Sequence, residues 1–573
     1  MALLTASDVT VWLQHLASAF AAAATDLARL DEQVGDGDHG ETMRRAFHAA
    51  AARVRADQAD TVQGALEAAA EAFMDAGGGA SGPLMASVFV GLARATEGRE
   101  TLTADVVAEG LRRSRDLVIR MGRCAPGDKT LLDALHPAAL AANEAAAREH
   151  DPAGVWQAAA VAAASGRDAT TELDGKAGRA AWVEGKGRGV ADPGATSMAL
   201  LLEHAARAAA GEQELVSPDA EDNMDAVTDA SAVGPDPRAA MLAGKFLNDP
   251  ADLVNEMIEG FVQAYPDRVR RLKGASIVVR ARPKPAGHVG LVIGNGSGHE
   301  PIAMGWVGTG LLDANAIGPV FTAPGPVAIA RAIAEADRGA GVLLLISHHA
   351  GDRIGGEMAA EMARVAGHDV ETLLMYDDVA SAPKGREAER RGAPGTAFIY
   401  KIVGAALEEG TDLAEAKALG QRIRDATRTL AVAVAPGTSP ITGQAMFSLP
   451  EGEAFIGMGV HGEPGFARMP AHPLDAICAR IVDGLIEDGG YESGETVSVF
   501  VNGSGGTSLM ELLAVARSVF AHLREVGIHY LAPLIGSYVT TQETKGFSVS
   551  LCRLRVDDRR RWTAPSDAPF FHL

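Results

Sequence analysis

The sequence predicts a multidomain protein, with an all-α bundle in its N-terminal part and an α/β domain in its C-terminal part. The chain has 573 residues, too many for one hydrophobic core, and 47% of them are hydrophobic, which is enough for packed cores. The first part is rich in alanine and places apolar residues at helical spacing. The second part alternates short apolar runs with helical stretches.

Residues 1–211 are expected to form an all-α bundle of roughly eight helices. Segments such as "VQGALEAAAEAFMDA" and "ATSMALLLEHAARAAA" place apolar residues three and four positions apart. Alanine is the strongest helix former, and its small side chain lets helices approach closely. Residues 212–240 are acidic, contain turn residues and have no hydrophobic period, so we expect a linker there.

Residues 241–573 follow the order strand, glycine turn, helix, strand, which is typical of an α/β sheet with crossover connections. Apolar runs such as "GVLLLIS" are separated by helical stretches such as "PVAIARAIAEADRG". The expected strands are 276–281, 288–298, 341–347, 370–376, 429–435 and 496–505.

The net charge of −22 argues against a nucleic-acid partner, because such proteins need a basic face. The three cysteines, Cys124, Cys478 and Cys552, are far apart, which argues against a disulfide framework and against a thiolate zinc site. The chain contains neither an apolar run of membrane-spanning length nor a signal peptide at its start. We therefore expect a cytoplasmic protein without a membrane partner.

Three aspartates, Asp31, Asp36 and Asp38, lie close together in the glycine-rich stretch "DEQVGDGDHGE". A solvated loop is one interpretation, and a structural calcium loop is another, although the spacing does not fit an EF-hand. Gathered carboxylates need compensating charge, and Mg²⁺ commonly bridges protein carboxylates to substrate phosphates. The glycines allow a loop to bring these side chains inward. We favour a metal–phosphate site.

The same half of the chain offers groups that bind phosphate. "GGGASGP" (77–83) precedes an apolar run, and small residues at the start of a helix expose backbone N–H groups to anions. "PGDKT" (126–130) and "DPGATS" (192–197) add further turns. Arg179 is either a nucleotide contact or an ordinary surface charge.

In the C-terminal half, histidines lie in the glycine-containing stretches "GSGHEP" (296–301), "HHAGD" (348–352) and "GMGVHGEPG" (457–465). A single loop histidine is most often a surface residue or a satisfied core residue. His299 and His461, however, each lie in a glycine-flanked setting with a glutamate close by. A neutral imidazole whose tautomer is fixed in this way can act as a base or a nucleophile.

Together these motifs resemble the dihydroxyacetone kinase family. "VGDGDHG", "GGASGP", "PGDKT" and "DPGATS" occur in the order found in its nucleotide-binding L-type domain, which is a helical barrel. The resemblance implies that Asp31, Asp36 and Asp38 hold two Mg²⁺ ions against the phosphates of ATP. It also implies that the nucleotide pocket consists of His39, Gly40, Thr42, Ala80, Ser81, Gly127, Arg179, Asp192, Pro193 and Gly194.

Residues 241–573 resemble the substrate-binding K-type domain of the same family, through "NGSGHEP", "RRGAPGT", "HGEPG" and "LIGSYVTT". The resemblance implies that His461 attacks the carbonyl of a short ketose and holds it as a hemiaminal. His299 and Asp352 would orient and deprotonate the terminal hydroxyl. The substrate-binding residues implied are Gly296, Ser297, Gly298, His299, Ser347, Asp352 and His461. A homodimer through this domain is also implied.

The chain departs from this family in two respects. Relatives often have "KNYTGD" where this chain has residues 347–352, "SHHAGD", and a second histidine where this chain has Ala303. Smaller side chains at Ser347 and Ala303 leave room for another carbon, so we expect the four-carbon ketose erythrulose to be preferred over dihydroxyacetone. The domain order is also reversed, since the L-type domain comes first.

The main prediction is an ATP-dependent ketose kinase. Three alternatives keep the fold and change the activity: a dihydroxyacetone phosphotransferase that is recharged by a phosphoprotein, a ligand-sensing co-regulator of transcription, and a lyase that cyclises FAD. Fusion of the two domains favours an exchangeable nucleotide, and the catalytic histidine and the aspartates are present.

Overall fold

The computed structural model describes residues 5–35, 37–148, 151–177, 184–211, 244–463 and 465–572. The chain divides into two compact units, Met1–Gly234 and Pro235–Leu573. The expected linker 212–240 and the candidate residues Asp36 and Arg179 lie outside the described residues.

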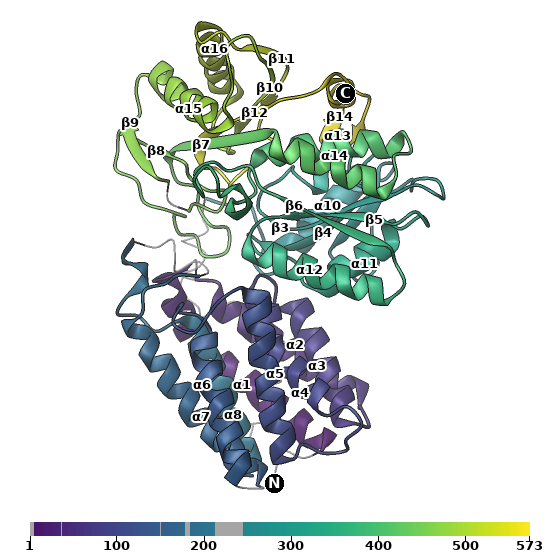
Figure 1. Ribbon diagram of the computed structural model, residues 1–573, viewed down its shortest axis with the longest axis vertical. Helices are drawn as coiled ribbons and strands as arrows, with labels where there is room; N and C mark the ends of the chain where they lie inside the picture. The colour runs from purple at the N-terminus through teal and green to yellow at the C-terminus, as the bar shows by residue number, and fades with distance from the viewer. Residues whose placement is uncertain are drawn as a thin grey trace, which may run out of the picture. The chain divides into compact units, whose positions relative to one another are not determined.

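The described part of the N-terminal unit consists of α-helices, short 3-10 helices and loops, with no strand. Each helix packs against the next one along the chain, and α8 packs against α1, so the helices close into a barrel (Figure 1). This confirms the predicted all-α helical barrel. The helices are α1 (Ala6–Glu32), α2 (His39–Asp57), α3 (Val62–Ala76), α4 (Ser81–Ala95), α5 (Ala104–Gly122), α6 (Leu132–Arg148), α7 (Pro152–Ala169) and α8 (Pro193–Ala209).

Aromatic side chains fill the inside of this barrel. Phe20 stacks on Phe47 with ring centroids 4.0 Å apart, and Phe47 meets Phe73 edge to face at 4.7 Å. Trp12 contacts Phe89 at 5.7 Å, and both are fully buried. Large rings supply much of the buried apolar surface, while the many alanines let the helix backbones approach one another.

The direction of the helices determines where their ends lie. Short connections between neighbouring helices make those helices antiparallel. The helices α2, α4 and α6 therefore begin at the same rim of the barrel. The start of α8 lies there too, because His39 at the start of α2 contacts Ser197 near the start of α8. The rim where these four helices begin is called the N-terminal rim below.

The C-terminal unit contains two six-stranded sheets. The first has the order β1-β2-β4-β3-β5-β6, and its strands β4, β3, β5 and β6 are parallel. These strands are β1 (Val269–Arg271), β2 (Ile277–Arg280), β3 (Gly290–Ser297), β4 (Ala314–Val320), β5 (Val342–Ser347) and β6 (Val370–Met375).

Helices cover both faces of the first sheet, because its central strands are apolar on both sides (Figure 1). In β5, Leu344 packs with α11 and α12, whereas Leu343 and Leu345 face the cluster that includes α13 and α14. The helices of this layer are α10 (Leu253–Ala264), α11 (Pro326–Ala336), α12 (Ala350–Val365), α13 (Ala397–Glu408) and α14 (Leu413–Asp425).

The second sheet has the order β11-β10-β12-β7-β8-β9 and packs against α15 and α16. Its elements are β7 (Thr427–Ala435), β8 (Glu453–Ile456), β9 (Ala467–Pro470), α15 (Leu474–Gly489), β10 (Thr496–Gly503), α16 (Leu509–Glu525), β11 (His529–Gly536) and β12 (Lys545–Cys552). The helix α17 (Val556–Trp562) and the two-stranded sheet of β13 (Asp567–Ala568) and β14 (Phe571–His572) end the unit. The predicted α/β domain is confirmed.

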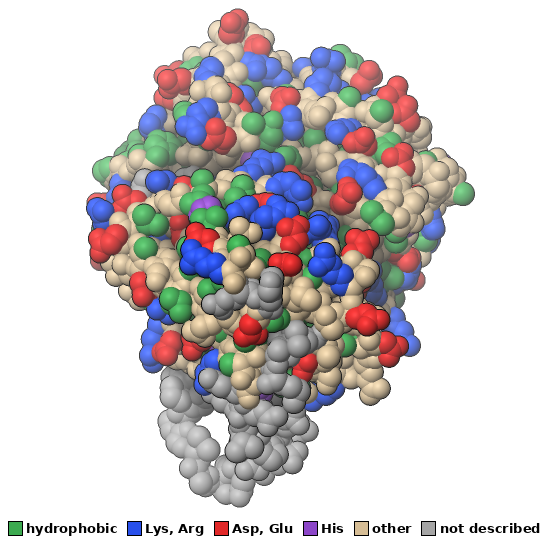
Figure 2. All heavy atoms as spheres, turned by 60° about the horizontal axis from the view of Figure 1, so that its bottom comes forward, with side chains coloured by type: hydrophobic (Ala, Val, Ile, Leu, Met, Phe, Trp, Pro, Cys, Tyr) green, Lys and Arg blue, Asp and Glu red, His purple; other side chains and the backbone are tan. Residues whose placement is uncertain are grey.

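All six strands predicted from the sequence are present, with ends that differ by up to a few residues. On the face shown in Figure 2, acidic and basic side chains are interspersed. Among the described residues, none of the helices combines the length and apolar character that crossing a lipid bilayer requires.

A buried ionic cluster joins three strands of the first sheet. Asp313, just before β4, accepts hydrogen bonds of 2.7 Å from both Arg280 and Lys284, and also one of 2.8 Å from the backbone N–H of Leu291 in β3. These cations hold the pKa of Asp313 below its usual value, even though burial opposes its charge.

We therefore expect Asp313→Asn to lower the free energy of unfolding by about 3–5 kcal/mol, because two buried cations lose their shared counter-charge. Chemical denaturation followed by a signal from the C-terminal unit measures this. Asp475→Asn is the control, because it breaks an exposed pair with Arg517 and is expected to change little. Equal midpoints for both variants would contradict the prediction.

Candidate functional site

The four glycine-containing motifs of the N-terminal unit all lie at the N-terminal rim. "DGDHG" leads into α2, "GGASGP" into α4, "PGDKT" into α6 and "DPGATS" into α8. Backbone N–H groups in the first turn of a helix have no partner within the helix, and the helix dipole makes that end positive. At α4 the residue before the helix is Ala80, which has no side chain that could cap these groups. The rim can therefore attract an anion such as a phosphate.

Asp31 and Asp38 lie on either side of the loop between α1 and α2. Asp31 is buried at the end of α1, and the backbone N–H of His39 donates to its Oδ2 at 3.3 Å. A Cβ at Gly35 would lie 2.3 Å from Asp31 Oδ1, and a Cβ at Gly40 would lie 1.9 Å from the carbonyl oxygen of Ala24. Only glycine allows the loop to approach α1 this closely.

His39 connects α2 to α8. Its Nε2 lies 2.8 Å from the hydroxyl oxygen of Ser197, and burial lowers the pKa of its imidazole. The role of Ser197 was missed in the sequence, although it belongs to the quoted "DPGATS" stretch.

Asp192 caps α8 by accepting a hydrogen bond of 2.7 Å from the backbone N–H of Ala195. Burial, together with the negative charges of Asp133 and Asp31, raises its pKa to about 7, while the hydrogen bond from Ala195 and the charge of Lys129 act in the opposite direction. Asp31, Asp133 and Asp192 therefore lie close enough to influence one another. A cation at this rim would stabilise all three carboxylates.

Asp133 and Lys129 shape the rim but were not identified from the sequence. Asp133 accepts hydrogen bonds from the backbone N–H groups of Gly127 at 2.5 Å and Thr130 at 2.8 Å. The buried ammonium group of Lys129 donates to the carbonyls of Thr170 and Val190. The spacing of Thr130 and Asp133, typical of a capping box, is a signal that could have revealed Asp133.

The remaining candidate nucleotide residues that the structure describes also lie at helix starts. Thr42 is buried in the first turn of α2, and Gly127 has a φ of 92° in the loop before α6. The residues brought to the rim are Asp31, Asp38, His39, Gly40, Thr42, Ala80, Ser81, Gly127, Asp192, Pro193 and Gly194. Carboxylate oxygens beside helix N-termini suit Mg²⁺ with a polyphosphate, because Mg²⁺ prefers oxygen ligands.

In the C-terminal unit, His461 lies in the loop after β8 and is oriented by Glu463. Its Nδ1 is 3.3 Å from Glu463 Oε1, and its backbone N–H donates to Oε2 at 2.9 Å. Despite burial, Arg391, 3.2 Å away, and His461 hold the pKa of Glu463 well below its usual value. A proton on Nδ1 shared with this carboxylate leaves the lone pair of His461 on Nε2.

Two further imidazoles flank His461. The ring of His299 is 4.9 Å and that of His349 is 4.8 Å from the His461 ring, between centroids. His299 Nδ1 is 2.8 Å from the carbonyl oxygen of Thr540, so it donates and Nε2 keeps the lone pair. Burial, together with repulsion from a protonated His461, lowers the pKa of both flanking histidines to about 3.

His299 and Asp352 follow the neighbouring parallel strands β3 and β5, so both lie at the carboxyl edge of the first sheet. This edge is where α/β sheets bind ligands. Burial raises the pKa of Asp352 to about 7, and its Oδ1 makes no hydrogen bond within the described structure. The buried hydroxyl of Ser297 likewise has no partner there. Hydroxyl groups of a bound ligand would satisfy such atoms.

The remaining predicted substrate residues lie at the same edge. Gly296 and Ser297 end β3, and Gly298 follows with a φ of 101°. Ser347 ends β5, where a Cβ at Gly392 would lie 2.5 Å from its hydroxyl oxygen. His349 was not predicted as a site residue, although it belongs to the quoted "HHAGD" stretch.

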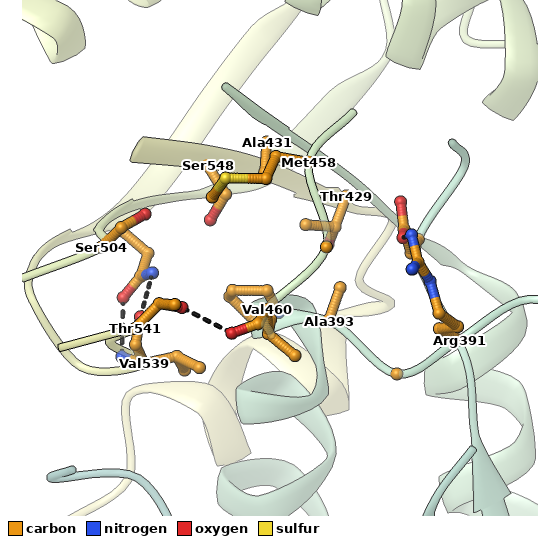
Figure 3. A pocket seen from close by; sticks show the side chains of 15 residues that line it. Arg391, Ala393, Thr429, Ala431, Met458, Val460, Ser504, Val539, Thr541 and Ser548 are labelled. Carbon is orange, nitrogen blue, oxygen red and sulfur yellow. Dashed lines mark hydrogen bonds and ion pairs between the residues drawn. The ribbon is translucent and has the colours of Figure 1, made fainter. Parts of the chain in front are cut away.

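A small internal cavity of about 20 Å³ lies beside the loop that carries His461 (Figure 3). The Thr541 hydroxyl donates a 2.7 Å hydrogen bond to the carbonyl of Val460, directly before His461. The cavity has room for about one water molecule, so it is too small for a sugar. Its wall instead fixes the backbone that presents His461.

Comparisons with known proteins match both units. Residues 259–570 match the Dak1 domain, and residues 33–207 match the DAK2 domain. The chain is 39% identical over 310 residues to the dihydroxyacetone-binding subunit of a PTS-dependent dihydroxyacetone kinase of Listeria innocua, covering 54% of this chain and 94% of that subunit.

Two other relatives are named for a four-carbon ketose. The L-erythrulose kinase of Pectobacterium atrosepticum is 37% identical, over 56% of this chain and 55% of its own length. The D-erythrulose kinase of Mycolicibacterium smegmatis is 36% identical, over 57% of this chain and 56% of its own length. These matches therefore span little more than half of either kinase.

Solved structures resemble the chain over a similar share. The dihydroxyacetone kinase of C. freundii in complex with AMP-PNP and Mg²⁺ has a TM-score of 0.52 and 30% identity, covering 57% of this chain and 60% of that one. A dihydroxyacetone kinase operon co-activator has a TM-score of 0.53 and 29% identity, covering 56% of this chain and 98% of its own.

The burial of His299 and His349 predicts that both imidazoles stay neutral when the pH falls from about 7 to about 5, whereas an ordinary histidine titrates near 6.5. Nitrogen NMR of protein labelled in histidine measures the charge of each ring. His299→Gln and His349→Gln identify the two signals. Protonation of either ring near pH 6 would show that its surroundings are more hydrated than the structure indicates.

Proposed function

The chain belongs to the dihydroxyacetone kinase family, whose Dak1 and DAK2 domains it carries in one polypeptide, and we propose that it is an ATP-dependent ketose kinase. In this proposal, a primary hydroxyl of a short ketose is phosphorylated while His461 holds the sugar as a hemiaminal. The observation that carries the proposal is the arrangement around His461. Its Nδ1 faces a charged glutamate, and its ring is flanked by neutral His299.

Carbonyl capture follows from the tautomer of His461. With the Nδ1 proton directed at Glu463, the Nε2 lone pair adds to the carbonyl carbon of the ketose. The resulting imidazolium gives up its Nδ1 proton on the Glu463 side and the carbonyl oxygen takes up one proton, so the net change moves the imidazole proton to the hemiaminal hydroxyl. A glycerol-like polyol has no carbonyl and cannot form this bond. Selection by bond formation rejects such polyols more strongly than hydrogen bonds to a small polyol would.

The hydroxyl that accepts the phosphoryl group needs a base. His299 and Asp352 are the proposed groups, because both lie at the carboxyl edge of the first sheet. His299 is neutral and its Nε2 can accept a proton, and Asp352 has a pKa of about 7, suitable for a base at neutral pH. Gly296, Ser297, Gly298 and Ser347 are proposed to line the same site.

The N-terminal unit is proposed to bind ATP, with Asp31, Asp36 and Asp38 holding two Mg²⁺ ions. When bound, the metal would neutralise charge on the phosphates. The chain contributes backbone N–H groups at the starts of α2, α4, α6 and α8, which can donate hydrogen bonds to the phosphates. The proposed pocket is His39, Gly40, Thr42, Ala80, Ser81, Gly127, Arg179, Asp192, Pro193 and Gly194. We assign residues 1–211 to this function, 212–240 to a linker and 241–573 to ketose binding.

Erythrulose is the proposed substrate. Ser347 is small, and the fully buried Ala303 has a φ of 61°, so that stretch of backbone is held in an unusual conformation with little side chain. Both features would give an additional carbon room. The names of the two erythrulose kinase relatives support the same substrate class. A homodimer through the C-terminal unit is a further proposal, based on the family resemblance.

Two other functions remain as competing proposals. A transferase recharged by a phosphoprotein has support from the relative in Listeria, which is named as PTS-dependent. A co-regulator has support from the co-activator structure. The DAK2 match within the same chain and the presence of His461 and Asp352 favour the kinase.

A kinase assay with ATP as the sole phosphoryl donor tests the proposal. We expect turnover of D- or L-erythrulose with a kcat/KM above that for dihydroxyacetone. His461→Ala should lower kcat/KM for ketoses by about 10³-fold or more, and should reduce the discrimination against glycerol. Turnover only when a phosphoprotein system is added would overturn the choice of donor, and a preference for dihydroxyacetone would overturn the choice of substrate.

The raised pKa of Asp352 predicts the pH dependence of the reaction. If Asp352 is the base, its carboxylate form increases as the pH rises through about 7, so kcat/KM should rise tenfold per pH unit below that value and level off above it. Asp352→Asn should remove this limb and lower kcat/KM by about 10²–10⁴-fold. His299→Ala is the control: it should lower the rate but keep the limb. If kcat/KM of Asp352→Asn still rises with pH below about 7, another group is responsible for this pH dependence.

A further inference from the structure

His349, His461 and Glu463 form a group of possible metal ligands, although the proposed ketose kinase reaction uses His461 and Glu463 without a metal ion. One ligand atom of each residue lies within 4.8 Å of the others. His349 directly precedes α12, and the other two residues lie in the loop after β8. Two imidazoles and one carboxylate form the ligand set of many zinc sites that keep a fourth position open.

The spacing of His461 and Glu463 suits one shared ion. Zinc lies about 2.0–2.2 Å from its nitrogen and oxygen ligands, so two ligands of a tetrahedral ion are roughly 3.3 Å apart. His461 Nδ1 and Glu463 Oε1 are 3.3 Å apart, which is long for a hydrogen bond between these groups. A metal ion can therefore replace the proton between them with little movement of either side chain.

His349 is held as metal-binding histidines usually are. Its Nε2 is 3.2 Å from the carbonyl oxygen of Gly392, and since a carbonyl can only accept, this nitrogen carries the proton. The lone pair is therefore on Nδ1. In metal sites, the imidazole nitrogen that does not bind the metal often donates a hydrogen bond to a backbone carbonyl, which fixes the tautomer. The His349 ring is tilted by 79° to the His461 ring.

An ion at Glu463 Oε1 would share this oxygen with Arg391, while Oε2 keeps its own hydrogen bond. Arg391 contacts Glu463 Oε1 at 3.2 Å and also contacts Asp378 at 2.9 Å, and the backbone N–H of His461 holds Oε2. Glu463 and His461 are about one-fifth and one-quarter exposed, so an ion has a path to them.

We propose that His349, His461 and Glu463 bind a borderline-soft divalent cation such as Zn²⁺, and that this cation inhibits carbonyl capture. When the cation occupies Nδ1 of His461, the imidazole proton resides on Nε2, which then has no lone pair for the carbonyl carbon. The cation and the ketose would exclude each other. The inhibition rests on the proposed function, whereas the binding of the metal does not.

Metal binding is tested on the full chain, without a polyhistidine tag, by titration with Co²⁺ in the presence of excess Mg²⁺. Magnesium saturates sites made of oxygen ligands, and tetrahedral Co²⁺ absorbs visible light. We expect one Co²⁺ per chain with this absorption, displaced by Zn²⁺. His349→Ala and His461→Ala should each weaken binding by at least about 100-fold.

His348→Ala is the matched control. His348 is the neighbouring histidine, its Nδ1 contacts the carbonyl oxygen of Arg390 at 2.7 Å, and it is outside the ligand group. It should bind Co²⁺ as the wild type does. Absence of the absorption in the wild type, or equal affinity in His349→Ala, would overturn the proposed site.

Kinetics test the inhibition. Micromolar Zn²⁺ should raise the KM for the ketose without changing the KM for ATP, a chelator should reverse the effect, and His349→Ala should be resistant. Binding of Co²⁺ without inhibition by Zn²⁺ would overturn the regulatory part. If the wild type phosphorylates no ketose, the proposed function fails, and the absorption titration still decides whether the metal site exists.

Discussion

The orientation of the His461 imidazole is the constraint on which the C-terminal site depends. Glu463 faces Nδ1, and Arg391 keeps Glu463 charged through a 3.2 Å contact. An imidazole without this carboxylate would exchange its proton between both nitrogens and would lose part of its reactive population. The second sheet supports the arrangement, because the Thr541 hydroxyl holds the backbone just before His461. Glu463, in the same loop, thus fixes the tautomer of His461, and Thr541, distant in sequence, fixes the backbone that carries it.

Both units place polar groups at the ends of regular elements. In the barrel, α2, α4, α6 and α8 begin at one rim, so their N–H groups converge there, beside the buried ammonium group of Lys129. In the α/β unit, the parallel strands β3 and β5 end side by side and bring His299 close to the α12 start that carries Asp352. The rigid barrel and sheet fix where the helices and strands end, and the short loops at these ends position the polar side chains.

Sequence periodicity was sufficient for the helices and for the six most apolar strands. The strands β1, β4, β8, β9, β11, β12, β13 and β14 were not predicted, because they are short or are interrupted by polar residues, glycine or proline, and gain their stability from non-local pairing. The motifs located the helix starts and the histidine loops. Periodicity could not reveal Lys129 or His349, whose positions depend on contacts between distant segments, whereas Asp133 is held by its neighbours Gly127 and Thr130. For His349, the doubled histidine before Asp352 was a visible signal without an assigned meaning.

The balance of charge distinguishes the two sites. At the barrel rim, carboxylates gather beside the positive ends of helices, an arrangement that suits a cation together with a polyphosphate. Around His461, the flanking imidazoles are neutral, and Arg391 is paired with both Asp378 and Glu463. A ketose is uncharged, so a site that binds it needs no unpaired charged side chain. The phosphorylated product carries at most two negative charges, and Arg391 would attract it only weakly, because Arg391 is already paired with two carboxylates. If the ketose binds at His461 as proposed, the same neutrality would favour release of the phosphate ester.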